Sequence, residues 1–204
     1  MSFWRLRDCT RAWERLAELR RTEGAELLEF ALVLPMLAAM VVGISDFGAA
    51  WALKDKLTNA ARDGARTAVS QPSCTISDSN NNLCGATPPN PPAWVSAVRD
   101  VVANYLTNAQ VTTCTIGNAA TSTGPFAWQY TSSTSGCGAF LLKIERGYTY
   151  TSGSSPTVTV GAARVTLSYP FSWSIGRVLK LMTPSSNLGN TITINTAVVI
   201  QNLT

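Results

Sequence analysis

The sequence predicts an α+β protein in which one long N-terminal helix leads into a domain with a further helix and an antiparallel sheet. Three patterns support this fold class. An uncharged apolar run covers residues 30–45, small apolar residues then recur every three or four positions to about residue 70, and apolar and polar residues alternate in several segments after residue 139. The chain has 204 residues, of which 46% are hydrophobic, enough for one medium domain and an accessory segment.

The apolar run is long enough to cross a membrane. As a helix, residues 27–47 would measure about 31 Å, close to the thickness of the hydrocarbon layer. We therefore expect a transmembrane helix over residues 25–53. A buried core helix is one alternative. Another is a signal peptide cut at Ala50-Trp51-Ala52, but Asp46 and the residues that follow make that region too polar and too long.

The charges around this run predict its orientation. Residues 1–24 hold six arginines, whereas only Lys54 and Lys56 follow the run closely. Because positive charges stay on the cytoplasmic side, we expect a basic cytoplasmic leader over residues 1–24 and an extracytoplasmic domain, with the span in the inner membrane.

The helix is expected to continue beyond the membrane as a stalk over residues 54–70. Its apolar stripe consists mainly of alanine and glycine, which allow another helix or a sheet to approach closely. Two interpretations remain open for this stripe, packing on the chain's own domain and packing on another subunit. The stripe comprises Ala50, Leu53, Leu57, Ala60, Ala61, Gly64 and Ala68.

Residues 71–204 are expected to form the outer α+β domain. Residues 71–92 and 117–138 are rich in polar and turn-forming residues and are predicted to be loops. Between them, Asn90 is expected to cap a helix with Pro91 in its first turn, which ends near Asn108. Its predicted buried face consists of Trp94, Val98, Val101, Val102 and Tyr105.

Alternation predicts the strands of this domain, over residues 140–144, 158–173 and 192–200. The phase of the second strand slips at Ala163-Arg164, which predicts a β-bulge there. A short helix is expected near residues 175–182, before the last strand.

Four of the five cysteines fall in the predicted outer domain, where disulfides form. Four cysteines allow three pairings. We favour Cys74 with Cys84 and Cys114 with Cys137, because each pair would close one of the two polar loops. A zinc site is the rival interpretation, but the spacings lack a short Cys-x-x-Cys knuckle.

Nothing in the sequence predicts an enzyme. The chain has no histidine, the most usual general base near neutral pH, and no phosphate-binding loop or nucleophile motif. Glu145 and Asp100 have no evident partner, and the Asn-rich stretch after Asp78 lacks the glycine and glutamate of a calcium loop. We expect no catalytic residue, no cofactor and no metal. A net charge of +4 is also too small for a nucleic-acid footprint.

Glu29 is the residue that does not fit a simple membrane span. A carboxylate at the edge of hydrocarbon is costly unless something pairs with it. Gly24 lies five residues earlier, and the order glycine, four residues, glutamate and the aromatic Phe30 resembles the processing site of type IV prepilins. That resemblance implies that a membrane peptidase cuts after Gly24, that Ala25 becomes the N-terminus, and that Glu29 pairs with the terminal amine of a neighbouring subunit.

The sequence from Glu29 onward contains further recognisable motifs, which are Glu29-Phe30-Ala31, Pro35, Gly43, Asp46-Phe47-Gly48 and the stretch from Ala60 to Arg66. Together they resemble the TadE-like family of Flp (tight adherence) pilus assembly proteins, and Tyr169-Pro170-Phe171 also resembles a recurrent motif of that family. Major Flp pilins favour tyrosine after the glutamate and are much shorter, so Phe30 and the large outer domain indicate a minor, pseudopilin-like role.

The resemblance implies a pilin-like subunit that packs through its hydrophobic helix. Its expected partners are other pilin-like subunits, pilus assembly membrane proteins, a prepilin peptidase and the membrane, and not a nucleic acid. The alternative is an uncleaved single-pass membrane protein whose outer domain binds an envelope component or anchors a secretion apparatus.

Overall fold

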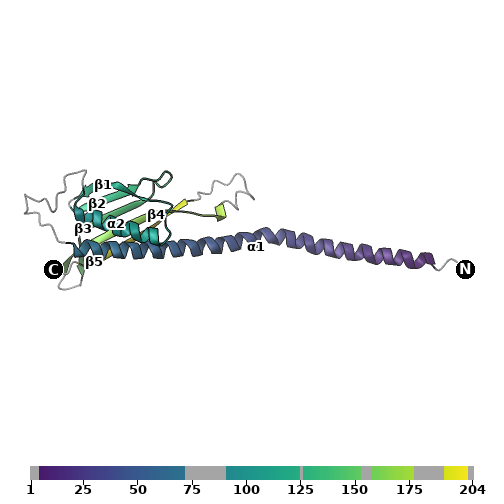
Figure 1. The fold of residues 1–204 in the computed structure, drawn as a ribbon. Helices are drawn as coiled ribbons and strands as arrows, with labels where there is room; N and C mark the ends of the chain where they lie inside the picture. The colour runs from purple at the N-terminus through teal and green to yellow at the C-terminus, as the bar shows by residue number, and fades with distance from the viewer. Residues whose placement is uncertain (1–4, 72–90, 125, 153–157, 177–190, 202–204) are drawn as a thin grey trace, which may run out of the picture. The chain divides into compact units, whose positions relative to one another are not determined.

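A computed structural model describes residues 5–71, 91–124, 126–152, 158–176 and 191–201. Over these residues the chain forms an α+β fold, as predicted (Figure 1). The described residues fall into two compact units. The first holds the chain up to Asp46 and the short segment that begins at Ser174, and the second begins at Phe47 and holds the sheet. The elements are α1 (Arg5–Ser70), α2 (Ala93–Asn108), β1 (Ile116–Gly124), β2 (Ala127–Ser132), β3 (Leu141–Ser152), β4 (Val158–Ser172) and β5 (Thr191–Gln201).

Helix α1 is a single helix of 66 residues that ends at Ser70, where the periodicity predicted its end. It includes Pro35, which cannot donate a backbone hydrogen bond to the preceding turn. Such prolines are tolerated in membrane helices because neighbouring groups and local adjustments satisfy the freed carbonyl. The leader, the predicted span and the stalk therefore belong to one element.

Helix α2 begins later than predicted and ends at the predicted residue. Its first residue is Ala93 and its N-cap is Pro92, which makes no side-chain cap hydrogen bond. Asn90, the predicted cap, lies outside the described residues. The buried residues recur at intervals of four, so they form one row, and Val101 and Tyr105 lie beside this row and are only half-buried. The buried row contains Trp94, Val98, Val102 and Leu106, with Val95 beside it.

The five strands form one antiparallel sheet in the order β1-β2-β3-β4-β5. Strands β3, β4 and β5 match the three predicted strands. The prediction of a loop over residues 117–138 was wrong, because most of this segment forms the hairpin of β1 and β2. Its serines, threonines and glycines hide the strand signal, and only Trp128 and Tyr130 of β2 alternate into the core.

The predicted bulge lies on the neighbouring strand. Strand β4 pairs with β5 through eleven residue pairs without a shift, so a bulge at Ala163-Arg164 was a wrong prediction. The register shift lies in the pairing of β3 with β4, between Glu145 and Tyr148. Between these two pairs, β3 therefore contains one residue more than β4, which is the arrangement of a β-bulge in β3.

The core lies between one face of the sheet and the helices. It includes the second part of α1, from Leu57 to Ala68, and the buried row of α2. A β-carbon on Gly64 would lie 2.7 Å from Cγ2 of Val102 in α2 and 3.7 Å from Cγ1 of Val165 in β4, so three elements meet closely at this glycine. The predicted helix near residues 175–182 lies outside the described residues beyond Gly176, and only Ile175 and Gly176 are seen to be helical.

Candidate functional site

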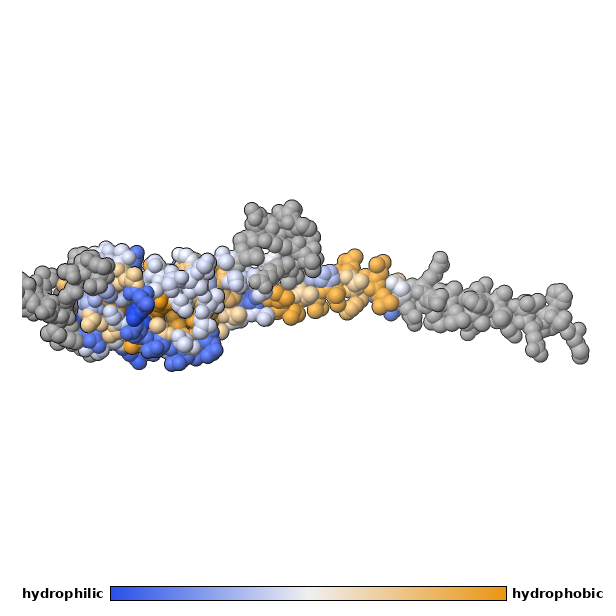
Figure 2. Space-filling model, turned by 45° about the horizontal axis from the view of Figure 1, so that its top comes forward, coloured by the Kyte–Doolittle hydropathy of each residue, from blue (hydrophilic) through white to orange (hydrophobic). Residues whose placement is uncertain are grey.

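The most unusual surface of the protein is the exposed apolar part of α1. The helix from Gly24 to Ser70 is long and apolar enough to cross a membrane, and none of its most apolar stretch is buried within the chain. Figure 2 shows these apolar side chains gathered along the helix. Soluble proteins rarely expose so large a continuous apolar surface, which indicates contact with lipid or with other apolar helices. The exposed side chains include Leu27, Leu28, Phe30, Leu32, Met36, Leu37, Met40, Val41 and Ile44.

The predicted processing and pairing residues lie at the beginning of this surface. Gly24, Ala25, Glu29 and Phe30 are all exposed, and Phe30 retains 63% of its accessible surface. A β-carbon on Gly24 would meet nothing within 4 Å. Among the side chains that the structure describes, none pairs with the Glu29 carboxylate. The site is therefore open to a peptidase and to a partner's cation.

A second acid of α1, Asp46, is buried and accepts a hydrogen bond. It is only 7% exposed, and its carboxylate accepts a hydrogen bond of 2.7 Å from the backbone N–H of Ile175. The Ile175 side chain lies against Gly43, one turn earlier, where a β-carbon would be 3.4 Å from Cδ1. Asp46 thus fixes the segment after β4 to α1 at the end of the apolar run. The sequence offered no signal for this contact beyond the Asp46-Phe47-Gly48 triplet, because the partners are 129 residues apart.

The structure shows whether the second part of the stalk packs on the chain's own domain or is free to pack on another subunit. Leu57, Ala60, Ala61 and Ala65 are fully buried in the core of the chain's own domain. These positions cannot also pack on another subunit. Any helix contact between subunits must therefore use the exposed residues before Leu57 or the outward side of the stalk.

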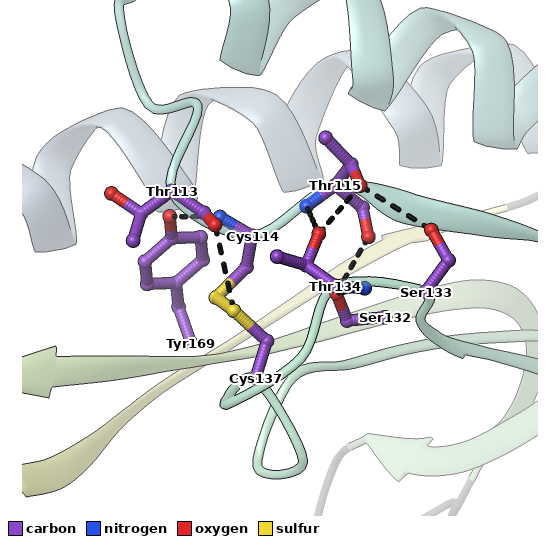
Figure 3. The surroundings of a disulfide bond; sticks show 8 residues. All are labelled: Thr113, Cys114, Thr115, Ser132, Ser133, Thr134, Cys137 and Tyr169. Carbon is purple, nitrogen blue, oxygen red and sulfur yellow. Dashed lines mark hydrogen bonds between the residues drawn. A yellow bond between two sulfur atoms is a disulfide. The ribbon is translucent and has the colours of Figure 1, made fainter.

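The predicted disulfide between Cys114 and Cys137 is present, with the two Cα atoms 5.7 Å apart. It joins the segment just before β1 to the connection between β2 and β3, so it closes the first hairpin (Figure 3). The backbone N–H of Cys114 donates to the hydroxyl of Tyr169 at 3.0 Å, and the Tyr169 ring packs edge-on against Phe140. Cys74 and Cys84, the other predicted pair, lie outside the described residues.

Neither of the two acids predicted to lack a partner is alone. Glu145 pairs with Lys143 at 2.9 Å and with Arg164 at 2.5 Å, and Asp100 pairs with Arg99 at 2.5 Å. The first network arises because Lys143 and Glu145 share a face of β3, and Arg164 of β4 lies directly opposite Glu145. These are ion pairs of the domain surface. Among the described residues there is no group of three or more potential metal ligands.

The fold and the exposed helix define a protein that has a helix able to span a membrane and a disulfide-bonded α+β domain. Residues 24–66 match the family model described as TadE-like protein, which confirms the resemblance over this segment. The match begins at the predicted processing glycine and ends within the buried stripe of the stalk. No curated protein and no solved structure matched the chain. The TadE-like family suggests a role in the Tad/Flp pilus system.

Proposed function

We propose that the protein is a minor pilin or pseudopilin-like subunit of a tight-adherence pilus assembly system, and a structural component rather than an enzyme. It inserts in the inner membrane with its N-terminus in the cytoplasm, is cut after Gly24 by a prepilin peptidase, and packs with other pilin-like subunits through its apolar helix. Its domain remains outside the membrane.

One observation carries this proposal, the carboxylate of Glu29, which pairs with none of the described side chains and lies beside an apolar helix surface. A carboxylate at the centre of a bilayer costs about 2.5 to 3.5 kcal/mol on insertion scales, and the cost is lower near the edge. Cleavage after Gly24 would create an ammonium group at Ala25 in every subunit. Pairing that group with Glu29 of a neighbour offsets the cost and fixes the axial register between helices. The TadE-like match over residues 24–66 supports the same function.

The mature N-terminus tests the processing step. In the native membrane we expect a chain that begins at Ala25 and is lighter than the full chain by about 3 kDa, by intact mass and N-terminal sequencing. Gly24→Val should block cleavage. Gly48→Val is the matched control, because Gly48 is also an exposed glycine of α1 with nothing within 4 Å of its β-carbon position. An intact N-terminus in the native chain would instead support the uncleaved single-pass protein.

The pairing step has its own matched pair of variants. Glu29→Gln should reduce assembly of the pilus about tenfold or more, whereas Glu26→Gln should leave it unchanged, since Glu26 is exposed one turn earlier on the same helix. Electron microscopy of shed pili measures the effect, and membrane levels of the protein must remain equal. Equal assembly in both variants would refute the pairing role.

A further inference from the structure

Two pairs of aromatic side chains lie near the point where α1 enters the domain. The ring centres of Phe47 and Trp51 in α1 lie 6.4 Å apart, and the two residues are 64% and 60% exposed. Phe171 at the end of β4 stacks edge-on with Trp173 at 5.2 Å, and both are half-buried. Aromatic residues with this mixture of apolar body and exposed surface are typical of the boundary between a membrane and water.

The two aromatic pairs flank α1 on different sides. With 3.6 residues per turn, Phe47, Trp51 and Lys54 share one face, and the Lys54 ammonium lies 5.9 Å from the Trp51 ring centre. Ala49 and Lys56 lie on the opposite face, which is turned toward β4. These two aromatic pairs, on two sides of the helix, are called the collar below.

A cleft of about 390 Å³ lies on the β4 side of this collar. Its walls are α1, the connection after α2, and the end of β4. The floor is largely apolar, with Ala52, Leu53 and Phe171, and the polar groups are those of Lys56, Gln110, Thr113 and Ser172. The Lys56 ammonium donates to the carbonyl of Ala109 at 2.8 Å, which holds the cation at the wall of the cleft.

Gln110, which follows the C-cap of α2, also lines the cleft. It adopts φ = 60°, a left-handed conformation that glycine accepts most readily and that carries a cost for other residues. Its N–H donates to the carbonyl of Thr107 at the end of α2. A glycine would end the helix here with less strain, whereas glutamine supplies an amide to the cleft.

We propose that this collar and cleft form a second membrane contact, in which the cleft binds the headgroup of an anionic phospholipid in the outer leaflet. Lys56, Gln110, Thr113 and Ser172 offer donors for a phosphate, and the apolar floor accepts the start of the acyl chains. The contact is continuous with the predicted span, which ends at Leu53 in the floor of the cleft. This inference rests on the membrane insertion in the proposed function and not on cleavage or pilus assembly.

Photocrosslinking in nanodiscs tests the contact on the full chain. A benzophenone amino acid in place of Phe171 or Trp173 should give adducts with phosphatidylglycerol. The control position is Tyr148, a half-buried aromatic residue whose β4 partner, Ala162, lies nine residues from Phe171, or about 30 Å along the strand. A benzophenone there should give at least about fivefold less lipid adduct.

Charge variants identify the headgroup site. The phosphatidylglycerol adduct at position 171 should fall about threefold or more in Lys56→Gln, persist in Lys56→Arg, and be weak with phosphatidylcholine alone. Lys54→Gln is the control, because Lys54 lies on the opposite face of the helix. Near-ultraviolet circular dichroism must show that each variant remains folded.

The other outcomes overturn the inference. An absence of lipid adduct at 171 and 173 from a carbonate-resistant membrane protein refutes the second contact and leaves the proposed function intact. Crosslinks to a second protein chain instead of lipid would show that the surface is a subunit interface. A protein that carbonate releases from the membrane would refute the proposed function itself.

Discussion

The two parts of α1 share one helical backbone, but the apolar side chains of the first part are exposed and those of the second part are buried. Between residues 27 and 47 most large apolar side chains are exposed, and Leu32 retains 76% of its accessible surface. From Leu57 onward the inward positions carry alanine, glycine and one leucine, and Leu57 is 0% exposed. The first part therefore has its apolar surface available to lipid or to other helices, whereas the second part has used its surface in folding. Side-chain size, and not helix propensity, distinguishes the exposed segment from the core segment here.

The strongest test of this difference is to make the same substitution in each part of α1. Leu57→Ala should lower the free energy of unfolding of the domain by about 3 kcal/mol, because it removes a fully buried side chain and leaves a cavity. Leu37→Ala, at a position that is 59% exposed, should leave the domain unchanged. Urea unfolding of the detergent-solubilised chain measures both. Equal effects would show that the two parts do not differ as described.

Loss of the disulfide should have the next largest effect on the free energy of unfolding of the domain. Replacing Cys114 and Cys137 together by alanine should lower the free energy of unfolding by about 3 kcal/mol, because the unfolded chain regains the freedom of a 23-residue loop. Urea unfolding under non-reducing conditions measures the loss. A loss below about 1 kcal/mol would show that the bond contributes little to the sheet that covers the stalk.

Two glycines sharpen the comparison further. Gly64→Leu should destabilise the domain by about 2 kcal/mol, because a β-carbon at this position would already lie 2.7 Å from the stiff, branched side chain of Val102. Gly48→Leu meets nothing within 4 Å and should cause no loss. Thermal unfolding in detergent distinguishes them, and a stable Gly64→Leu variant would contradict the close packing of α1 on α2.

The smallest expected effect concerns the outer face of the sheet. Burial raises the pKa of Glu145, but hydrogen bonds and charges from Lys143 and Arg164 outweigh it, so the pKa lies below its ordinary value of 4.5. The carboxylate thus stabilises the fold above pH 4.5, and this contribution is lost as the pH falls from 4.5 through the lower pKa of the folded state.

Glu145→Gln should therefore cost about 1 kcal/mol at pH 7 and flatten this acid-dependent loss. Asp100→Asn is the control, since its ion pair with Arg99 has a carboxylate that is 56% exposed. Unfolding curves between pH 3 and 7 measure the difference. An unchanged acid profile in Glu145→Gln would contradict the assignment.

Local periodicity explains which parts of the fold could be predicted. The stripe from Leu57 to Ala68 and the alternation in β4 are local patterns, and both are seen in the structure. The β1–β2 hairpin was missed because its serines, threonines and glycines resemble a loop until the disulfide and the neighbouring β3 hold it. The bulge was placed on the wrong strand because a phase slip does not show which of two paired strands carries the extra residue.

The same limit applies to the site. Gly24 and Glu29 could be identified because their spacing is a local motif next to an apolar run. The contact between Asp46 and Ile175, and the cleft lined by Leu53 and Phe171, join residues more than 100 positions apart. Such contacts depend on the folded sheet, so one sequence alone does not reveal them.

Accessibility of single cysteines tests the central difference between the two parts of α1 most directly. Leu37 and Arg66 are both exposed in the structure, with Leu37 at 59% and the Arg66 side chain at 75%, so only a surrounding membrane would distinguish them. In spheroplasts, a membrane-impermeant maleimide should label Arg66→Cys but not Leu37→Cys, and detergent should make Leu37→Cys reactive. Equal labelling of both residues in the intact membrane would contradict the account.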